Sequence, residues 1–366
     1  MILCTPSLID ILGVKTFDGN SEKRTLAEFP EMPTSIASLE EYTSLIDAYI
    51  KDNFGLRDLL VKIDYQISYD IFGVAGNEKV IVGKDNWLFL DEIVGVSTID
   101  YYKNKSPFTN LELDQWQLVL ESRANWLKRR GIQYYFFVAP NKHSLYPEFI
   151  PDSILQVSDV SRYDQLYAQL DRSEILQTID VKQILLDSKE EYPLYYRSGT
   201  HWNSYGAFIG YMSILDKITE ELPELSVVEI EDYSVETRTE KGSDLAQLIN
   251  LQDSITEESP MISTNIPRTY ELENEYTDED GRVISHYVNP NGEPLKILML
   301  GDSFMNALKP YFAQSFSEAT FCSSSSTNFP VQYIEEYEPD IVIQEIVERR
   351  IGVEDPFNPV IMEVMK

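Results

Sequence analysis

Three long apolar runs, separated by helical patterns, constrain the fold of this chain more than any other feature of its sequence. The runs lie at 132–140 (IQYYFFVAP), 295–302 (LKILMLGD) and 339–348 (PDIVIQEIVE). A nearly continuous apolar run of this length is typical of a strand that is covered on both faces. A shorter apolar run lies at 175–181 (ILQTIDV). Four helical patterns complete the alternation, at 111–130, 159–171, 204–221 and 304–316. Strands that alternate with helices predict βαβ units, and therefore an α/β fold with a parallel sheet flanked by helices.

Residues 1–77 do not follow this alternation. The polar segment 15–37 contains two prolines, which is typical of an extended arm. Apolar residues then recur at helical spacing from Ser38, with a break at Gly55, so we expect two helices, the first with Ser38 as its N-cap. The sequence therefore divides into an N-terminal arm with helices and an α/β domain at 78–366.

Two segments of the α/β domain predict hairpins. Residues 78–90 (EKVIVGKDNWLFL) are two short apolar strands joined by a Lys-Asp-Asn turn at 84–86. Residues 252–294 are acidic, rich in Asn, Pro and Thr, and interrupt the alternation of strands and helices. We interpret this second segment as an insertion over one edge of the sheet, with a hairpin that turns at Asp280-Gly281.

A serine follows one of the apolar runs. The sequence LKILMLGDSF combines an apolar strand, a Gly-Asp-Ser turn that ends at Ser303, and a helix. Ligands of parallel sheets bind at the carboxyl ends of the strands, and N–H groups at the start of a helix can stabilise an oxyanion there. A serine hydroxyl becomes a nucleophile only when a base takes its proton. Without such a base, a serine at this position is a common helix N-cap.

The candidate base is His201, one of only three histidines in the chain. It lies in the segment SGTHWNSYGA, a polar loop that opens a helix, with Asn203 or Ser204 as the expected N-cap. A histidine in such a loop can lie in a cleft, where Trp202 either walls the pocket or packs. We predict that His201 and Ser303 lie together, since both loops lie at strand ends or helix starts.

The charge balance excludes one class of partner. The 366 residues contain 30 Lys and Arg against 61 Asp and Glu, a net charge of −31. Nucleic-acid binding relies on basic residues that neutralise phosphates, so we expect no nucleic-acid partner. The acidic surface either aids solubility or faces a cationic partner. No Walker loop, dinucleotide-binding glycine pattern or HExxH sequence is present, so we expect no cofactor and no metal.

The cysteines and the first residues say little about location by themselves. Cys4 and Cys322 provide neither a disulfide framework nor metal-ligand spacing. The first 14 residues (MILCTPSLIDILGV) are apolar but too short to span a bilayer. They are either the remainder of a signal anchor or a buried first segment.

Both loops have counterparts in a known family. GDSF and THWN followed by YGA resemble the SGNH-hydrolase-like domain of the alginate O-acetyltransferase family, the AlgJ/AlgX type. The resemblance continues, in the same order, through five further segments: EKRTLAEFPEMP, YIKDNFGLRDLL, VGKDNWLFL, VAPNKHSLYPEFIP and DIVIQEIVERRI. It extends from about Glu22 to Ile351 and implies an SGNH-hydrolase-like sheet, with the N-terminal helical arm and the acidic insertion as additions.

The resemblance also implies an activity. Ser303 would be the nucleophile that carries an acetyl group, and His201 would be its general base. The acceptor would be a hydroxyl of an exported cell-surface polysaccharide, and the upstream acetyl donor would be a membrane-bound O-acyltransferase. An extracytoplasmic location, reached through an N-terminal signal or membrane anchor, would follow.

One position departs from the family pattern. The family has an aspartate two residues before the histidine, where this chain has Gly199. Loss of such an orienting acid has cost on the order of 10⁴-fold in turnover in a serine protease. Asp244, in GSDLAQL, and a backbone carbonyl are the alternatives that we consider. Asp302 is less suited, because adjacent side chains on a turn diverge.

Four residues are candidates for binding the sugar or its carboxylate: Lys142, Tyr146, Arg197 and Trp202. The alternative is that they are surface residues or members of local salt bridges. Because the net charge would repel an anionic glycan, we expect either a locally basic cleft, formed by Lys142 and Arg197, or a neutral glycan.

Two other functions stay open at this point. The glycine at residue 199 favours a non-catalytic glycan-binding or assembly subunit with a degenerate site, whereas the intact serine and histidine favour an enzyme. If water is the only acceptor, the enzyme is a carbohydrate acetylesterase.

Overall fold

The computed structural model describes residues 27–33, 35, 37–53, 57–93, 95–225, 233–324 and 329–365. They form two compact units that interleave along the chain. The first comprises the described residues up to Asp91 with Arg197–Gly199 and Lys241–Glu257, and the second comprises the remainder. The boundary that the sequence places after residue 77 therefore falls inside the first unit.

The first unit contains helices and one small hairpin. Its elements are α2 (Ala37–Asn53), α3 (Arg57–Phe72), β1 (Val80–Val82), the 3₁₀ helix η2 (Lys84–Asn86), β2 (Leu88–Leu90) and α10 (Asp244–Leu248). The predicted hairpin is confirmed, because β1 and β2 pair antiparallel on either side of the turn. Apolar side chains of the hairpin and of α10 share one buried cluster, which includes Leu88 and Leu245.

The predicted start of the first helix needs a correction. Helix α2 begins at Ala37, so Ser38 lies inside its first turn and is not the N-cap. The expected break at Gly55 lies outside the described residues, as do Cys4 and the apolar first segment.

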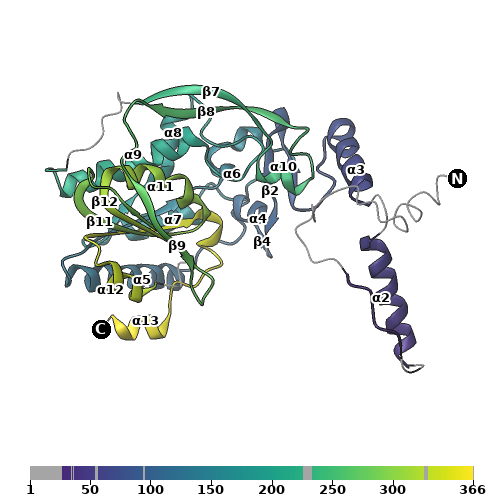
Figure 1. Ribbon diagram of the computed structural model, residues 1–366, viewed down its shortest axis with the longest axis horizontal. Helices are drawn as coiled ribbons and strands as arrows, with labels where there is room; N and C mark the ends of the chain where they lie inside the picture. The colour runs from purple at the N-terminus through teal and green to yellow at the C-terminus, as the bar shows by residue number, and fades with distance from the viewer. Residues whose placement is uncertain are drawn as a thin grey trace. The chain divides into compact units, whose positions relative to one another are not determined.

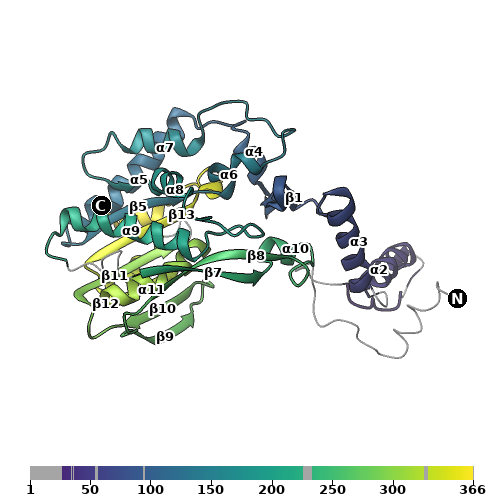
Figure 2. The same cartoon turned by 90° about the horizontal axis from the view of Figure 1, so that it is seen from above.

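The second unit is built on a seven-stranded sheet in the order β6-β5-β13-β11-β12-β10-β9 (Figures 1 and 2). Its strands are β5 (Gln133–Ala139), β6 (Gln177–Ile179), β9 (Glu271–Thr277), β10 (Val283–Val288), β11 (Glu293–Gly301), β12 (Phe316–Ser323) and β13 (Ile341–Val347). The first five strands of that order pair in parallel, as the alternation predicts. The predicted insertion supplies β9 and β10, an antiparallel hairpin that extends one edge of the sheet.

Helices cover both faces of this sheet. Figure 1 shows α8, α9 and α11 on one face and α5 and α12 on the other. The helices of the unit are α4 (Thr98–Tyr102), α5 (Asn110–Lys128), α6 (Lys142–Leu145), α7 (Arg162–Leu170), α8 (Val181–Ser188), α9 (Ser204–Glu221), α11 (Lys309–Ser315), α12 (Val331–Tyr337) and α13 (Pro359–Val364). The described residues of this unit also form the 3₁₀ helices η3 (Pro147–Phe149), η5 (Ser303–Ala307) and η6 (Glu348–Arg350). Two further strand pairs lie outside the main sheet: β3 (Glu92–Ile93) with β4 (Val96–Ser97), and β7 (Tyr233–Lys241) with β8 (Thr256–Thr264).

Local sequence signals explain where the main helices begin. Thr109 and Glu112 form a capping box at the start of α5, since each side chain binds the other residue's backbone N–H. The Asn203 side chain accepts a hydrogen bond from the N–H of Gly206 and caps α9, as the sequence predicts. The carboxyl ends of β5, β11 and β13 then lie at one edge of the sheet, from which the candidate site is built.

The sequence missed one central strand. A single helix was expected at 304–316, but the chain forms the short η5, then α11, and enters β12 at Phe316. Strand β12 ends in serines and has no strong apolar run beyond Phe321 and Cys322, so it resembles a loop. It is a strand because β11 and β10 pair with it on both sides. Among the described residues, no helix is long and apolar enough to cross a membrane.

Candidate active site

Ser303 lies directly after β11, at the carboxyl edge of the sheet. It is exposed and is the first residue of η5. The turn before it is fixed by Asp302, whose carboxylate accepts hydrogen bonds from the N–H groups of Phe304 (3.1 Å) and Val347 (2.9 Å). Because the Asp302 carboxylate binds two backbone N–H groups in this way, it stabilises the turn. The backbone N–H of Ser303 itself donates to none of the described residues.

The histidine loop is tied to the same turn. Trp202 is buried, and its Nε1 donates a hydrogen bond to the backbone carbonyl of Phe304 at 3.1 Å. The loop is closed by an antiparallel bridge between Tyr195 and Trp202. The His201 ring lies against the Phe304 ring, with 4.9 Å between the ring centroids. These contacts fix the histidine relative to the serine turn.

The two predicted residues meet. His201 Nε2 lies 2.7 Å from Ser303 Oγ, which is hydrogen-bonding distance, although 102 positions separate them in the chain. On the other side of the ring, Nδ1 lies 3.0 Å from the Thr200 hydroxyl. This arrangement provides a base at the oxygen of a potential nucleophile. The sequence did not indicate Thr200, although a hydroxyl next to a candidate histidine was a usable signal.

Gly199 and Asp244 are neighbours within the first unit. A Cβ at residue 199 would lie 2.6 Å from Ser243 Oγ and 2.8 Å from Asp244 Oδ1, closer than real side chains pack. The Ser198 carbonyl accepts the N–H groups of Leu245 and Ala246, each at 3.1 Å, and holds the start of α10 beside this segment. A larger residue at 199 would therefore have to displace the Ser243 and Asp244 side chains, which occupy the space that its side chain would need.

Three of the four predicted sugar-binding residues are buried. Lys142 donates to the Tyr196 carbonyl at 3.1 Å. The Tyr146 hydroxyl accepts the N–H of Leu194 at 2.8 Å, and burial raises its pKa to about 12. Trp202 faces Phe304, as described above. Tyr146 and Trp202 thus support the loops around the site, and their binding of sugar stays a prediction.

The fourth, Arg197, belongs to the first unit and is half-buried. Its guanidinium donates to the Thr256 carbonyl at 2.7 Å, and its backbone N–H donates to the Glu257 carboxylate. These bonds anchor the arginine to the start of β8. No described group of His, Cys, Asp or Glu side chains has the arrangement of a metal site.

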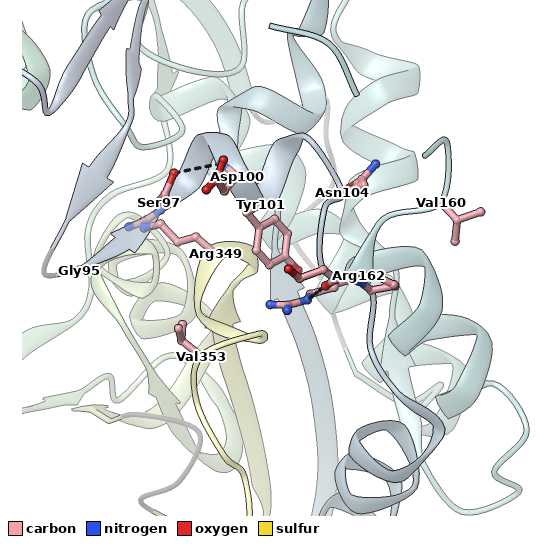
Figure 3. A pocket seen from close by; sticks show the side chains of 11 residues that line it. Gly95, Ser97, Asp100, Tyr101, Asn104, Val160, Arg162, Arg349 and Val353 are labelled. Atoms are coloured by element: carbon pink, nitrogen blue, oxygen red, sulfur yellow. Dashed lines mark hydrogen bonds between the residues drawn. The ribbon is translucent and has the colours of Figure 1, made fainter. Parts of the chain in front are cut away.

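The second unit contains a cavity of about 270 Å³, whose lining includes Tyr101, Arg162 and Arg349. Figure 3 shows the Tyr101 ring with the side chains of Arg349 and Arg162 on either side of it. Arg349 follows β13, and its guanidinium lies 5.7 Å from the centre of the Phe304 ring. Arg162 donates to the backbone carbonyls of Ser106 and Gly352, and no carboxylate among the described residues forms a salt bridge with it.

Two guanidinium groups and one carboxylate line this cavity. Its one acidic residue, Asp100, is paired with Lys105 at 2.7 Å, and the hydrogen bond from Lys105 lowers the pKa of Asp100. Basic side chains therefore outnumber acidic ones in the lining. The sequence did not predict it, although the position of Arg349 directly after a parallel strand pointed to the functional edge of the sheet.

The chain thus has the features of an α/β enzyme domain, an exposed serine beside a histidine at the carboxyl edge of a parallel sheet. The family model for the SGNH hydrolase-like domain of acetyltransferase AlgX matches residues 80–322. This is more than half of the chain, which therefore belongs to that family.

Related sequences and structures agree with this assignment. The chain is 25% identical over 268 residues to the probable alginate O-acetylase AlgJ of Pseudomonas syringae pv. tomato, a match that covers 73% of this chain and 64% of the relative. It is 26% identical over 237 residues to the AlgJ of Pseudomonas aeruginosa, covering 63% and 54%. The matches thus span less than two thirds of these relatives.

Two solved structures share the fold. Bacillus cereus PatB1 superposes with a TM-score of 0.55 at 18% identity, over 75% of this chain and 97% of that one. The O-acetyltransferase domain of Pseudomonas putida AlgJ gives 0.53 at 15% identity, over 78% and 98%. The predicted SGNH-hydrolase-like fold is confirmed.

Proposed function

We propose that this protein is an O-acetyltransferase that transfers acetyl groups to hydroxyls of an exported polysaccharide through an acyl-enzyme on Ser303. The observation that carries the proposal is the 2.7 Å separation of Ser303 Oγ and His201 Nε2 at the carboxyl edge of the sheet. Family membership and the names of the AlgJ relatives support the acetyl chemistry.

The proposed reaction has two halves. In the first, His201 Nε2 accepts the Ser303 proton while Oγ attacks the acetyl carbonyl of the donor. The oxyanion that forms accepts the backbone N–H of Ser303, which no described residue uses. The donor's leaving group departs with the proton from His201, and acetyl-Ser303 remains. In the second half, a sugar hydroxyl gives its proton to His201, attacks the ester and frees the serine.

We assign the orienting acid to Asp244. Its carboxylate fills the space beside residue 199, where the family pattern has an aspartate. The Thr200 hydroxyl at Nδ1 of His201 is a second polar partner for the imidazole. An acid that holds the correct tautomer and stabilises the imidazolium accounts for several orders of magnitude in serine enzymes.

For the acceptor, we propose a polysaccharide that carries carboxylates. Arg349 and Arg162, which line the cavity, support this choice, because a guanidinium binds a carboxylate in a bidentate manner. Lys142 and Arg197 are additional binding candidates, with Tyr146 and Trp202 behind them. The resemblance to the family adds a membrane-bound O-acyltransferase as acetyl donor and an extracytoplasmic location.

The direct test is acetyl transfer from p-nitrophenyl acetate to defined oligosaccharides, followed by mass spectrometry of the products. We expect acetylated oligouronate, and for Arg349→Gln a rise in acceptor KM of about 10-fold or more with the rate of p-nitrophenol release unchanged in the absence of acceptor. Equal acetylation of a neutral oligosaccharide would contradict the carboxylate assignment. Hydrolysis with every acceptor would make the protein an esterase, and binding without any acetyl turnover would make it a glycan-binding subunit.

A further inference from the structure

A buried glutamate lies beneath the turn that carries Ser303. Glu345, on β13, is only 2% exposed, and its Oε2 accepts the backbone N–H of Asp302 at 2.7 Å. A Cβ at Gly301 would lie 2.5 Å from the same oxygen, so this carboxyl occupies the space that a side chain at 301 would take. Glu345 is therefore packed directly against the backbone that precedes the nucleophile.

The charge of Asp302 acts on Glu345. The Asp302 carboxylate already accepts two backbone N–H groups, from Phe304 and Val347. Burial, and next the charge of Asp302, raise the pKa of Glu345 well above its ordinary value. In its neutral form Glu345 keeps the hydrogen bond that it accepts from the Asp302 N–H without placing a second negative charge beside the Asp302 carboxylate.

The other titratable groups that face Glu345 do not replace this arrangement. The positive charge of Arg349, on η6, lowers the pKa of Glu345 and so favours the charged carboxylate. Tyr195 lies on the histidine loop, and Glu345 is one of the charges that raise its pKa. If Glu345 ionised, two carboxylates would adjoin in a buried site, where their repulsion is strong.

We propose that Glu345 is a positioning residue that clamps the Gly301–Ser303 turn through the Asp302 N–H, and that its ionisation as pH rises loosens this clamp. This inference rests on the proposed acyl transfer at Ser303. The clamp acts through the Asp302 backbone, one residue from the serine, where a displacement of about 1 Å can cost on the order of 10²-fold in rate.

The expected pH dependence has a definite sign. A carboxyl whose pKa is raised by folding holds a proton that the unfolded chain has lost, so folding stability falls as pH rises from the ordinary glutamate value toward the raised one. The same rise in pH ionises Glu345 and loosens the turn. Both stability and acylation should therefore decline as pH rises.

The test compares Glu345→Gln with Glu345→Leu. Glutamine stays neutral at every pH and can accept the Asp302 N–H, whereas leucine cannot accept it. We expect Glu345→Leu to lower kcat for p-nitrophenyl acetate by about 10- to 100-fold with little change in KM. We expect the kcat of Glu345→Gln to stay within a few fold of the wild-type value at neutral pH. We also expect this variant to lack the fall in kcat that the wild type shows as pH rises.

A matched control is available in Glu348→Gln. Glu348 is equally buried and burial raises its pKa, but it accepts from the Asn141 N–H and the Ser144 hydroxyl instead of the nucleophile turn. This variant should retain the fall in kcat with rising pH. If Glu345→Gln also retains it, or is as slow as Glu345→Leu at neutral pH, the proposal is overturned.

The pH dependence of thermal unfolding separates this proposal from the proposed function. Should the wild type fail to acylate Ser303, the acyl-transfer function fails, but the clamp still predicts that Glu345→Gln gains stability relative to the wild type as pH rises. Parallel unfolding curves for the two proteins across that range would reject the clamp. If Glu345→Leu does not fold, the pH profile of kcat and the pH dependence of unfolding of Glu345→Gln decide.

Discussion

At the scale of single residues, the chain departs from its family at one position, and we propose that another residue takes over the lost role. Gly199 stands where the family has an acid, and the Asp244 carboxylate lies in the space that a side chain at 199 would occupy. A sequence can show that an aspartate is missing, but Asp244 comes 45 positions later in the chain, and only close packing in the first unit brings it beside Gly199.

This packing predicts that restoring the family residue does harm. Gly199→Asp must push its Cβ against Ser243 and Asp244 and place a second carboxylate beside the first, so we expect a lower rate of p-nitrophenyl acetate hydrolysis and a loss of about 1 to 3 kcal/mol in stability. Gly199→Ala isolates the steric part. Calorimetry and initial rates measure both effects, and a faster Gly199→Asp enzyme would show that Asp244 does not act as the acid.

The Asp244 assignment has its own test. Asp244→Asn keeps the size of the side chain but removes the charge, so we expect kcat to fall by on the order of 10²- to 10⁴-fold while KM changes little. The full pH profile of the variant, compared with that of the wild type, distinguishes a lost orienting acid from a folding defect. A wild-type rate in a folded Asp244→Asn protein would leave Thr200 as the partner of the imidazole.

At the scale of elements, the site joins two loops that the sequence identified separately. The strands β5, β11 and β13 were predictable because each is a continuous apolar run. The loops after them carry Lys142, Ser303 and Arg349. Strand β12 was not predictable, because it depends on pairing with its neighbours. The arginine cavity was not predictable, because it combines side chains from distant segments of the chain.

The link between the loops makes Trp202 a sensitive position. Trp202→Phe removes the hydrogen bond to the Phe304 carbonyl and leaves that buried oxygen without its donor, which costs about 1 to 3 kcal/mol. We expect a lower melting temperature and a lower kcat together. Trp126→Phe is the control, since its buried Nε1 has no hydrogen-bond partner among the described residues. Equal effects on kcat in the two variants would argue against a special role for the link.

At the scale of the whole molecule, the charge and the proposed substrate oppose each other. A net charge of −31 repels a carboxylated glycan at long range, whereas we propose that Arg162 and Arg349 in the cavity bind it locally. Composition predicted this conflict, and with it either a basic cleft formed by Lys142 and Arg197 or a neutral glycan. Lys142 is instead buried and bound to the Tyr196 carbonyl, and the arginines that line the cavity are Arg162 and Arg349.

This opposition predicts an unusual salt dependence. Raising the ionic strength from about 0.01 to about 0.1 M shortens the Debye length from about 30 to about 10 Å, which screens the distant surface charges more than contacts inside the cavity. We therefore expect kcat/KM for an oligouronate acceptor to rise severalfold over this range and to stay flat for a neutral acceptor. A fall in kcat/KM with increasing salt would mean that attraction by the arginines outweighs repulsion by the surface charge at every distance.

The most direct test of the central claim is the intact mass of the protein after brief exposure to p-nitrophenyl acetate, followed by peptide mapping. We predict one added acetyl group, located on Ser303, which is absent from Ser303→Ala and forms at least 10²-fold more slowly in His201→Ala because the base is lost. Acetylation elsewhere, or equal labelling of the wild type and Ser303→Ala, would contradict the acyl-enzyme.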